Sequence, residues 1–124
     1  AALRLSHADA ASPERTRDLA RIATAARLIE AHHPEPLSVA DIAAAVGLSR
    51  YPFLRRFSTV LGVTPYQYLL NRRLRAAARA LREDRMSVLD AALSAGFGDL
   101  SEFTRRFRRT FGQTPASWRR GKIV

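Results

Sequence analysis

The sequence predicts an all-α chain, because three observations agree. Its 124 residues are 47% hydrophobic, which is enough apolar material for the core of one small domain. No stretch of four to eight residues shows the apolar–polar alternation, bounded by turns, that is typical of a β-strand. An internal repeat marked by helix caps and glycines divides the chain into segments of helical length.

Two blocks of the sequence match each other at an offset of 49 or 50 residues. Ser38-Val39-x-Asp41 recurs as Ser87-Val88-x-Asp90 at the offset of 49. Arg55-Arg56-Phe57 recurs as Arg105-Arg106-Phe107 at the offset of 50. Two copies are too few for a solenoid, so the repeat indicates a duplicated supersecondary unit.

Each copy is predicted to be a helix, a tight turn and a second helix. Ser38 and Ser87 have the side chain of an N-cap residue, with an acid three positions later. Gly47 and Gly96 follow the first helices, because glycine tolerates the positive φ that ends a helix. The predicted helices are 13–32, 39–46, 50–61, 65–83, 88–95 and 100–111, and Thr114-Pro115 marks a further helix start.

The positive charge is concentrated in one part of the chain. There are 21 Lys+Arg against 11 Asp+Glu, a net charge of +10, and 20 of the basic residues are arginine. Residues 1–48 hold five arginines and six acids, a net of −1, which leaves 16 basic and five acidic residues and a net of +11 for residues 49–124. A genome preference for arginine would enrich it everywhere, so the asymmetry favours a directed surface for an anionic partner, either nucleic acid or an acidic membrane.

Several other classes of protein are disfavoured. The chain has no cysteine, which excludes disulfides, thiolate metal sites and cysteine nucleophiles. No apolar run approaches the roughly 18 residues of a membrane span, and no secretion signal is visible, so we expect a cytoplasmic protein that does not bind a membrane. No nucleophile motif, phosphate-binding glycine loop or carboxylate constellation is present, so we expect no enzyme, no cofactor and no metal.

A helical wheel gives each second helix an apolar side and a polar side. In a helix-turn-helix the second helix enters the major groove of DNA, and arginine binds guanine O6/N7 or phosphate through its planar fork. Arg55 and Arg105 occupy the same wheel position, opposite the core, although either could be a solvated surface arginine, and Ser101 and Glu102 could instead cap their helix. The expected core side is Phe53, Phe57, Val60 and Leu61 in the first copy, and Leu100, Phe103, Phe107, Thr110 and Phe111 in the second. The expected DNA side is Tyr51, Arg55, Ser58 and Thr59 in the first copy, and Ser101, Glu102, Arg105, Arg108 and Arg109 in the second.

Three stretches resemble the AraC/XylS family of bacterial transcription regulators. They are Leu48-Ser49-Arg50-Tyr51-Pro52-Phe53-Leu54-Arg55-Arg56-Phe57, the segment 61–69, and the segment 95–115, which resembles the family's signature region. The similarity covers about residues 17–120. It implies seven helices, with two helix-turn-helix subdomains joined by a long linker helix. It also implies sequence-specific binding of double-stranded DNA, with two recognition helices in successive major-groove segments.

The resemblance also assigns roles to individual residues. Leu54 is assigned by the resemblance alone, and as an apolar side chain it could touch a thymine methyl or no base. Pro52 stands where a polar residue is common and removes one contact, so we expect the second copy to supply more of the affinity. The implied base contacts are Tyr51, Leu54, Arg55, Ser101, Glu102 and Arg105. Apart from the resemblance, we expect phosphate contacts at Arg50, Ser58, Thr59, Arg108 and Arg109.

The expected organisation is a linker remnant over 1–12, a helix-turn-helix subdomain over 13–63, a linker helix over 64–83 and a second subdomain over 84–124. Many members of the family have a sensor or dimerisation domain ahead of this one, and nothing in this chain resembles it. A contact with RNA polymerase is compatible with these expectations. The competing hypothesis is a basic architectural module with little preference for base sequence.

Overall fold

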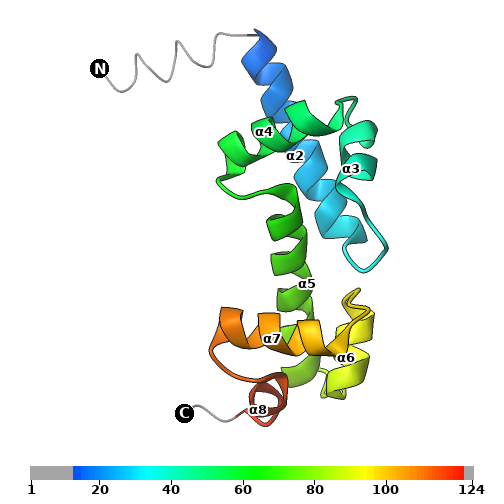
Figure 1. The fold of residues 1–124 in the computed structure, drawn as a ribbon, viewed down its shortest axis with the longest axis vertical. Helices are drawn as coiled ribbons and strands as arrows, with labels where there is room; N and C mark the ends of the chain where they lie inside the picture. The colour runs from blue at the N-terminus through cyan, green and yellow to red at the C-terminus, as the bar shows by residue number, and fades with distance from the viewer. Residues whose placement is uncertain (1–12, 122–124) are drawn as a thin grey trace, which may run out of the picture. The chain divides into compact units, whose positions relative to one another are not determined.

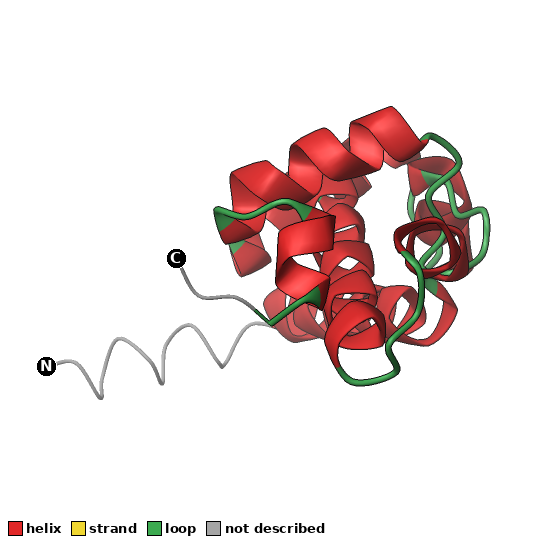
Figure 2. Cartoon of the chain, turned by 90° about the horizontal axis from the view of Figure 1, so that it is seen from below, coloured by secondary structure: helices red, strands yellow, loops and turns green. Residues whose placement is uncertain are grey.

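The computed structural model describes residues 13–121, and every regular element in that range is an α-helix (Figure 1). Figure 2 shows only helices and loops in the same residues. The all-α prediction with seven helices is therefore confirmed, whereas the expected linker remnant over 1–12 lies outside the described residues. The helices are α2 (Pro13–His32), α3 (Val39–Ala45), α4 (Arg50–Leu61), α5 (Pro65–Arg82), α6 (Val88–Ser94), α7 (Leu100–Phe111) and α8 (Pro115–Arg119).

The helix ends agree with the local signals in the sequence. The Ser38 hydroxyl accepts a hydrogen bond from the Asp41 backbone N–H at 3.0 Å, and the Asp41 carboxylate accepts one from the Ser38 N–H at 3.3 Å. This reciprocal pair is a capping box that opens α3. Helices α3, α5 and α6 each end one residue before the predicted position, because the last expected residue leaves the helix as a cap or turn residue.

The contacts divide the chain into two units. Among the described residues, unit 1 comprises 13–31 and 37–68, and unit 2 comprises 32–36 and 69–121. Unit 1 contains nearly all of α2, together with α3, α4 and the first residues of α5. Unit 2 contains the rest of α5 and α6 to α8, together with the last residue of α2 and the four residues that follow it. Each unit therefore includes one copy of the repeated helix–turn–helix segment.

The core of unit 1 is made by one side of α4 packed on α2 and α3. Phe53 and Phe57 are completely buried, with their ring centroids 5.5 Å apart. Tyr68 at the start of α5 meets Phe57 edge-on at 5.7 Å. The other buried apolar side chains of this unit are Ile22, Ala25, Ile29, Ile42, Ala43, Val46 and Pro65.

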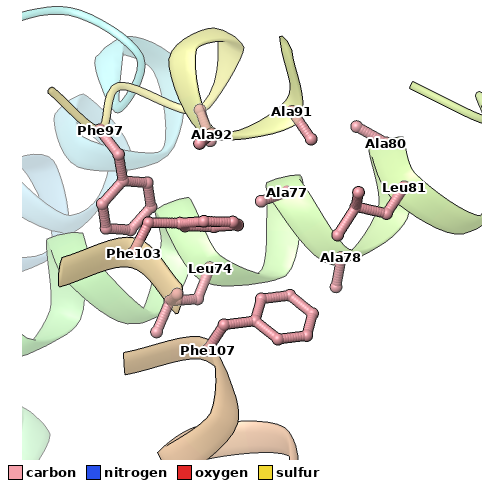
Figure 3. Close-up of a cluster of buried hydrophobic side chains, with 11 residues drawn as sticks. Leu74, Ala77, Ala78, Ala80, Leu81, Ala91, Ala92, Phe97, Phe103 and Phe107 are labelled. Carbon is pink, nitrogen blue, oxygen red and sulfur yellow. The ribbon is translucent and has the colours of Figure 1, made fainter. Parts of the chain in front are cut away.

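The core of unit 2 repeats this arrangement and adds a cover. Phe103 and Phe107 of α7 are completely buried, with centroids 5.6 Å apart, and Phe97 packs on Phe103 at 4.9 Å (Figure 3). Trp118 of α8 lies over Phe107 at 5.9 Å and donates its indole N–H to the Ala78 carbonyl at 2.9 Å. The small residues packed around these rings are Ala77, Ala78, Ala80, Ala91, Ala92 and Ala95.

Four residues expected in the core are exposed instead. Val60 and Leu61 end α4 at 40% and 39% exposed, and Leu100 begins α7 at 45% exposed. Thr110, in the last turn of α7, is exposed as well. The wheel prediction was wrong here because a helical wheel gives the direction of a side chain and not its depth. All four residues lie in the first or last turn of a twelve-residue second helix, which is longer than the seven-residue helix before it.

The repeat supplies matched glycines in different surroundings. Gly47 has φ +74° and an added Cβ would meet no atom within 4 Å. Gly96 has φ +100°, and its Cβ would lie 3.0 Å from Arg73 Nε and 3.1 Å from the carbonyl oxygens of His33 and Pro34. We expect Gly47→Ala to lower the free energy of unfolding by about 1 kcal/mol through backbone strain alone, and Gly96→Ala by about 2 kcal/mol or more through strain and overpacking. Urea unfolding followed by circular dichroism checks this order, and equal losses would contradict it.

The second helices begin with different caps. Asp99 accepts hydrogen bonds from the backbone N–H groups of Ser101 at 2.9 Å and Glu102 at 3.1 Å, whereas Ser49 makes no side-chain cap bond to α4. We therefore expect Asp99→Ala to destabilise unit 2 by about 1 kcal/mol. The matched control, Ser49→Ala, should stay within about 0.5 kcal/mol of the parent. The fluorescence of the single tryptophan, Trp118, follows urea unfolding of unit 2 directly.

Candidate nucleic-acid interface

The repeated Arg-Arg-Phe triplet has the same structure in both units. Its phenylalanine is completely buried, and its middle arginine is half-buried and pairs with a carboxylate. Its first arginine is exposed on the opposite side of the helix. The triplet therefore separates a core residue, a structural ion pair and an outward-facing cation. The buried residues are Phe57 and Phe107, the pairs are Arg56–Asp18 at 3.4 Å and Arg106–Glu102 at 3.2 Å, and the exposed arginines are Arg55 and Arg105.

Helix α7 carries three exposed arginines, Arg105, Arg108 and Arg109. Arg105 and Arg108 border a hollow of about 520 Å³ along the outer side of the helix. Within residues 13–121, Arg105, Arg108 and Arg109 form no hydrogen bond or ion pair with the protein. Their guanidinium groups are therefore available for an anionic ligand. The residues lining this hollow are Leu100, Ser101, Thr104, Arg105, Arg108 and Thr114.

The start of α7 separates Ser101 from Glu102. Asp99 caps this helix with its carboxylate, so the alternative in which the Ser101 or Glu102 side chain caps it is wrong. Ser101 is exposed and lines the hollow beside Arg105. Glu102 is half-buried, and its carboxylate accepts a hydrogen bond from Arg106 Nε at 3.2 Å. Any contact of Glu102 with a base would compete with this ion pair.

Helix α4 presents a less charged surface. Tyr51 is 69% exposed, and the Arg55 guanidinium lies 5.7 Å from the centroid of its ring. This cation–π contact restricts both side chains on the outer side of the helix. Thr59 is exposed, but its hydroxyl donates to the Arg55 carbonyl at 2.8 Å, a bond within the helix. Of the remaining predicted residues of α4, Arg50 is exposed and Leu54 and Ser58 are half-buried.

Acidic side chains of α2 lie beside the Arg55 side of α4. A hollow of about 410 Å³ in unit 1 is bordered by Arg55 and Thr59 of α4 and by Glu14 and Asp18 of α2. The same lining includes Arg15 and Arg56, and Asp18 pairs with Arg56, so the surroundings of Arg55 are of mixed charge. The hollow of α7 has no acidic residue in its lining. The two second helices are therefore similar in fold and different in electrostatics.

Thr104 belongs to this surface although the sequence analysis did not select it. It is half-buried and lines the α7 hollow with Ser101, Arg105 and Arg108. The signal that could have found it is the repeat, because an offset of 50 residues makes Thr104 the counterpart of Leu54. A threonine offers a hydroxyl and a methyl group where the first copy offers only a leucine.

Other arginines have structural contacts. The Arg82 guanidinium lies 3.8 Å from the centroid of the Trp118 ring. Arg119 donates to the Met86 carbonyl at 2.7 Å and to the Arg85 carbonyl at 2.9 Å. These contacts hold α8 to the segment before α6. Their charge adds to the overall field, but their side chains are engaged within the protein.

The described part of the chain has neither a membrane-spanning helix nor a cluster of metal ligands. No helix in residues 13–121 has the length and apolar composition needed to cross a membrane. The same residues contain no group of three or more His, Asp or Glu side chains arranged to hold a metal ion.

Comparison with known proteins gives one consistent result. Residues 42–121 match the family of the helix-turn-helix domain. The transcriptional activator NphR of Rhodococcus sp is 40% identical over 112 residues, which are 90% of this chain and 32% of NphR. The chain thus spans about a third of the length of that relative.

Solved structures match about four fifths of this chain. An AraC-type transcriptional regulator from Chromobacterium violaceum is 35% identical with a TM-score of 0.76, over 82% of this chain and 91% of that one. The DNA-binding domain of AdpA, solved in complex with a target DNA, is 32% identical with a TM-score of 0.77, over 81% and 90% of the two chains. Together with the repeated helix–turn–helix geometry, these matches show that the chain belongs to the helix-turn-helix family of AraC-type DNA-binding domains.

Proposed function

We propose that this chain is the sequence-specific, double-stranded-DNA-binding part of a transcription regulator. The observation that carries the proposal is the repeated triplet, which turns Arg55 and Arg105 outward from equivalent positions on two second helices. An exposed arginine on such a helix can make a bidentate contact with guanine in the major groove. The similarity to AdpA, whose domain was solved with a target DNA, supports the same conclusion.

The proposed contacts divide into two kinds. Base contacts determine which sequence is bound, and phosphate contacts supply affinity and position the protein. We assign base contacts to Tyr51, Leu54, Arg55, Ser101, Glu102 and Arg105, and add Thr104 because it lines the same hollow as Arg105. We assign phosphate contacts to Arg50, Ser58, Thr59, Arg108 and Arg109, which are exposed or half-buried on the same two helices.

We infer that the second unit supplies more of the affinity. Its helix α7 has three arginines without protein partners in the described residues, whereas Arg55 of α4 lies beside Glu14 and Asp18. Phosphate binding depends on the number of cations that release counterions from DNA. The α7 surface therefore contributes more to this electrostatic part of the binding free energy.

The remaining proposals concern the larger protein. We propose subdomain boundaries at 13–63 and 84–124, with 64–83 as a linker segment that contains helix α5. We further propose that the parent protein acts in the cytoplasm, where it contacts RNA polymerase and is controlled by a separate sensor or dimerisation domain. NphR, about three times the length of the matched segment, has room for such a domain.

The first prediction separates specific from general DNA binding. Duplexes selected by this protein from a random library should contain two motifs about one helical turn apart, one for each second helix. Displacing the protein from such a duplex should require a concentration of random duplex at least about 1,000-fold higher than the concentration of the selected duplex that has the same effect. If random DNA competes equally well, the protein is a low-specificity architectural module and the proposal fails.

The second prediction concerns individual arginines. Arg105→Ala should weaken binding to the selected duplex by about 1–3 kcal/mol and relax the preference at one base pair, because it removes a base contact. Arg109→Ala should weaken binding to all sequences similarly and reduce the salt dependence by about one unit of slope, because it removes a phosphate contact. Arg55→Ala is the matched variant in the first copy and should cost less than Arg105→Ala. A sequence preference of Arg105→Ala identical to that of the parent would remove Arg105 from base recognition.

A further inference from the structure

The segment 32–36, which begins at the last residue of α2, belongs to a different unit from the rest of α2 and from α3. Residues 32–36 are assigned to unit 2 by their contacts, although α2 up to residue 31 and α3 belong to unit 1. The segment is closed on itself, because the Glu35 N–H donates to the His32 carbonyl at 2.9 Å and the His32 ring pairs with the Glu35 carboxylate at 2.7 Å. We call residues 32–36 the crossing loop.

Arg73 of α5 holds the crossing loop inside unit 2. Its Nε donates to the His33 carbonyl at 2.6 Å, and its Nη2 donates to the Glu35 carbonyl at 2.8 Å. Arg73 is half-buried, and charged donors make stronger hydrogen bonds to carbonyls than neutral donors do. The planar guanidinium fork can bind both oxygens at once, which the single ammonium group of a lysine cannot do with the same geometry.

The turn before α7 closes around the same loop. A Cβ on Gly96 would lie 3.1 Å from the carbonyl oxygens of His33 and Pro34 and 3.0 Å from Arg73 Nε. The corresponding turn of the first copy is open, since a Cβ on Gly47 would meet nothing within 4 Å. This difference between the copies shows that the second turn is built to accept the crossing loop.

The clamp changes how the two units are connected. Within residues 13–121 the chain passes between the units three times, at 31/32, at 36/37 and within α5 at 68/69. If Arg73 released the crossing loop, two of these three passages would be held less firmly in unit 2. We propose that Arg73 is a positioning residue for DNA binding: it narrows the range of orientations open to the two units, so that the second recognition helix engages DNA at a smaller entropic cost once the first is bound. The effect on DNA binding rests on the proposed function, whereas the clamp itself rests on the hydrogen bonds of Arg73 to the crossing loop.

The clamp can be tested without DNA. The sequence has no cysteine, so Ala23→Cys in α2 and Ala116→Cys in α8, both exposed, allow one spin label to be placed in each unit. Arg73→Ala should broaden the distribution of distances between the labels, and Arg73→Lys should broaden it as well, because the lysine keeps the charge and loses the fork. Arg75→Ala is the matched control, since Arg75 is an exposed arginine on the same helix that makes no hydrogen bond or ion pair inside the described residues. Identical distributions for Arg73→Ala, Arg75→Ala and the parent would overturn the clamp.

The consequence for DNA is tested with two duplexes, a selected site with both motifs and the same duplex with one motif scrambled. Arg73→Ala should lower affinity for the two-motif duplex about tenfold and affinity for the one-motif duplex less than twofold, because only the first requires both units at once. Arg75→Ala should change both affinities by the same factor. Equal losses for Arg73→Ala on both duplexes, or no loss on either, would overturn the positioning role. Lack of sequence preference in the parent would instead refute the proposed function, and the spin-label result would still decide the clamp.

Discussion

The rest of the structure depends on two buried phenylalanines four residues apart in each second helix. Phe53 and Phe57 in unit 1, and Phe103 and Phe107 in unit 2, are completely buried. When residues i and i+4 of a helix face the core, residue i+2 must point nearly the opposite way, because each residue turns by about 100°. Core packing therefore determines the outward direction of Arg55 and Arg105, and the ring contacts that stabilise the fold also orient the proposed DNA surface.

The two units share a repeated helix–turn–helix segment, but they differ in their helix caps, in their covering helix and in the charges on their second helices. The second unit has a covering helix with Trp118, a helix start capped by Asp99 and an α7 surface with three unengaged arginines in the described residues. The first unit has no cap bond at Ser49 and carries carboxylates of α2 beside Arg55. The same fold thus supports one hollow whose charged residues are all cations and one hollow lined by both cations and carboxylates. This combination suits a protein in which phosphate affinity and base discrimination are shared unequally between two helices.

A net charge does not show which cations are available to a ligand. Of the arginines after residue 49, Arg56 and Arg106 pair with carboxylates, and Arg73 and Arg119 donate to backbone carbonyls. These side chains hold helices or loops in place, and their cost of desolvation is offset by their hydrogen bonds. The charge of these arginines still attracts DNA at a distance. Short-range contacts with DNA require the few arginines that make no hydrogen bond or ion pair within the protein.

The sequence by itself determined the all-α class, the helix positions to within a residue and the direction of Arg55 and Arg105, because caps, turn glycines and helical periodicity are local properties. It did not determine which wheel positions are deep enough to be buried, as the exposed Val60 and Leu100 show. Nor did it predict the ion pair of Glu102 within α7 or the place of Thr104 in the hollow. The clamp of Arg73 on the crossing loop joins residues about 40 positions apart, and only the tertiary structure decided it, because a bond between distant segments depends on how the helices pack and not on any pattern along the chain.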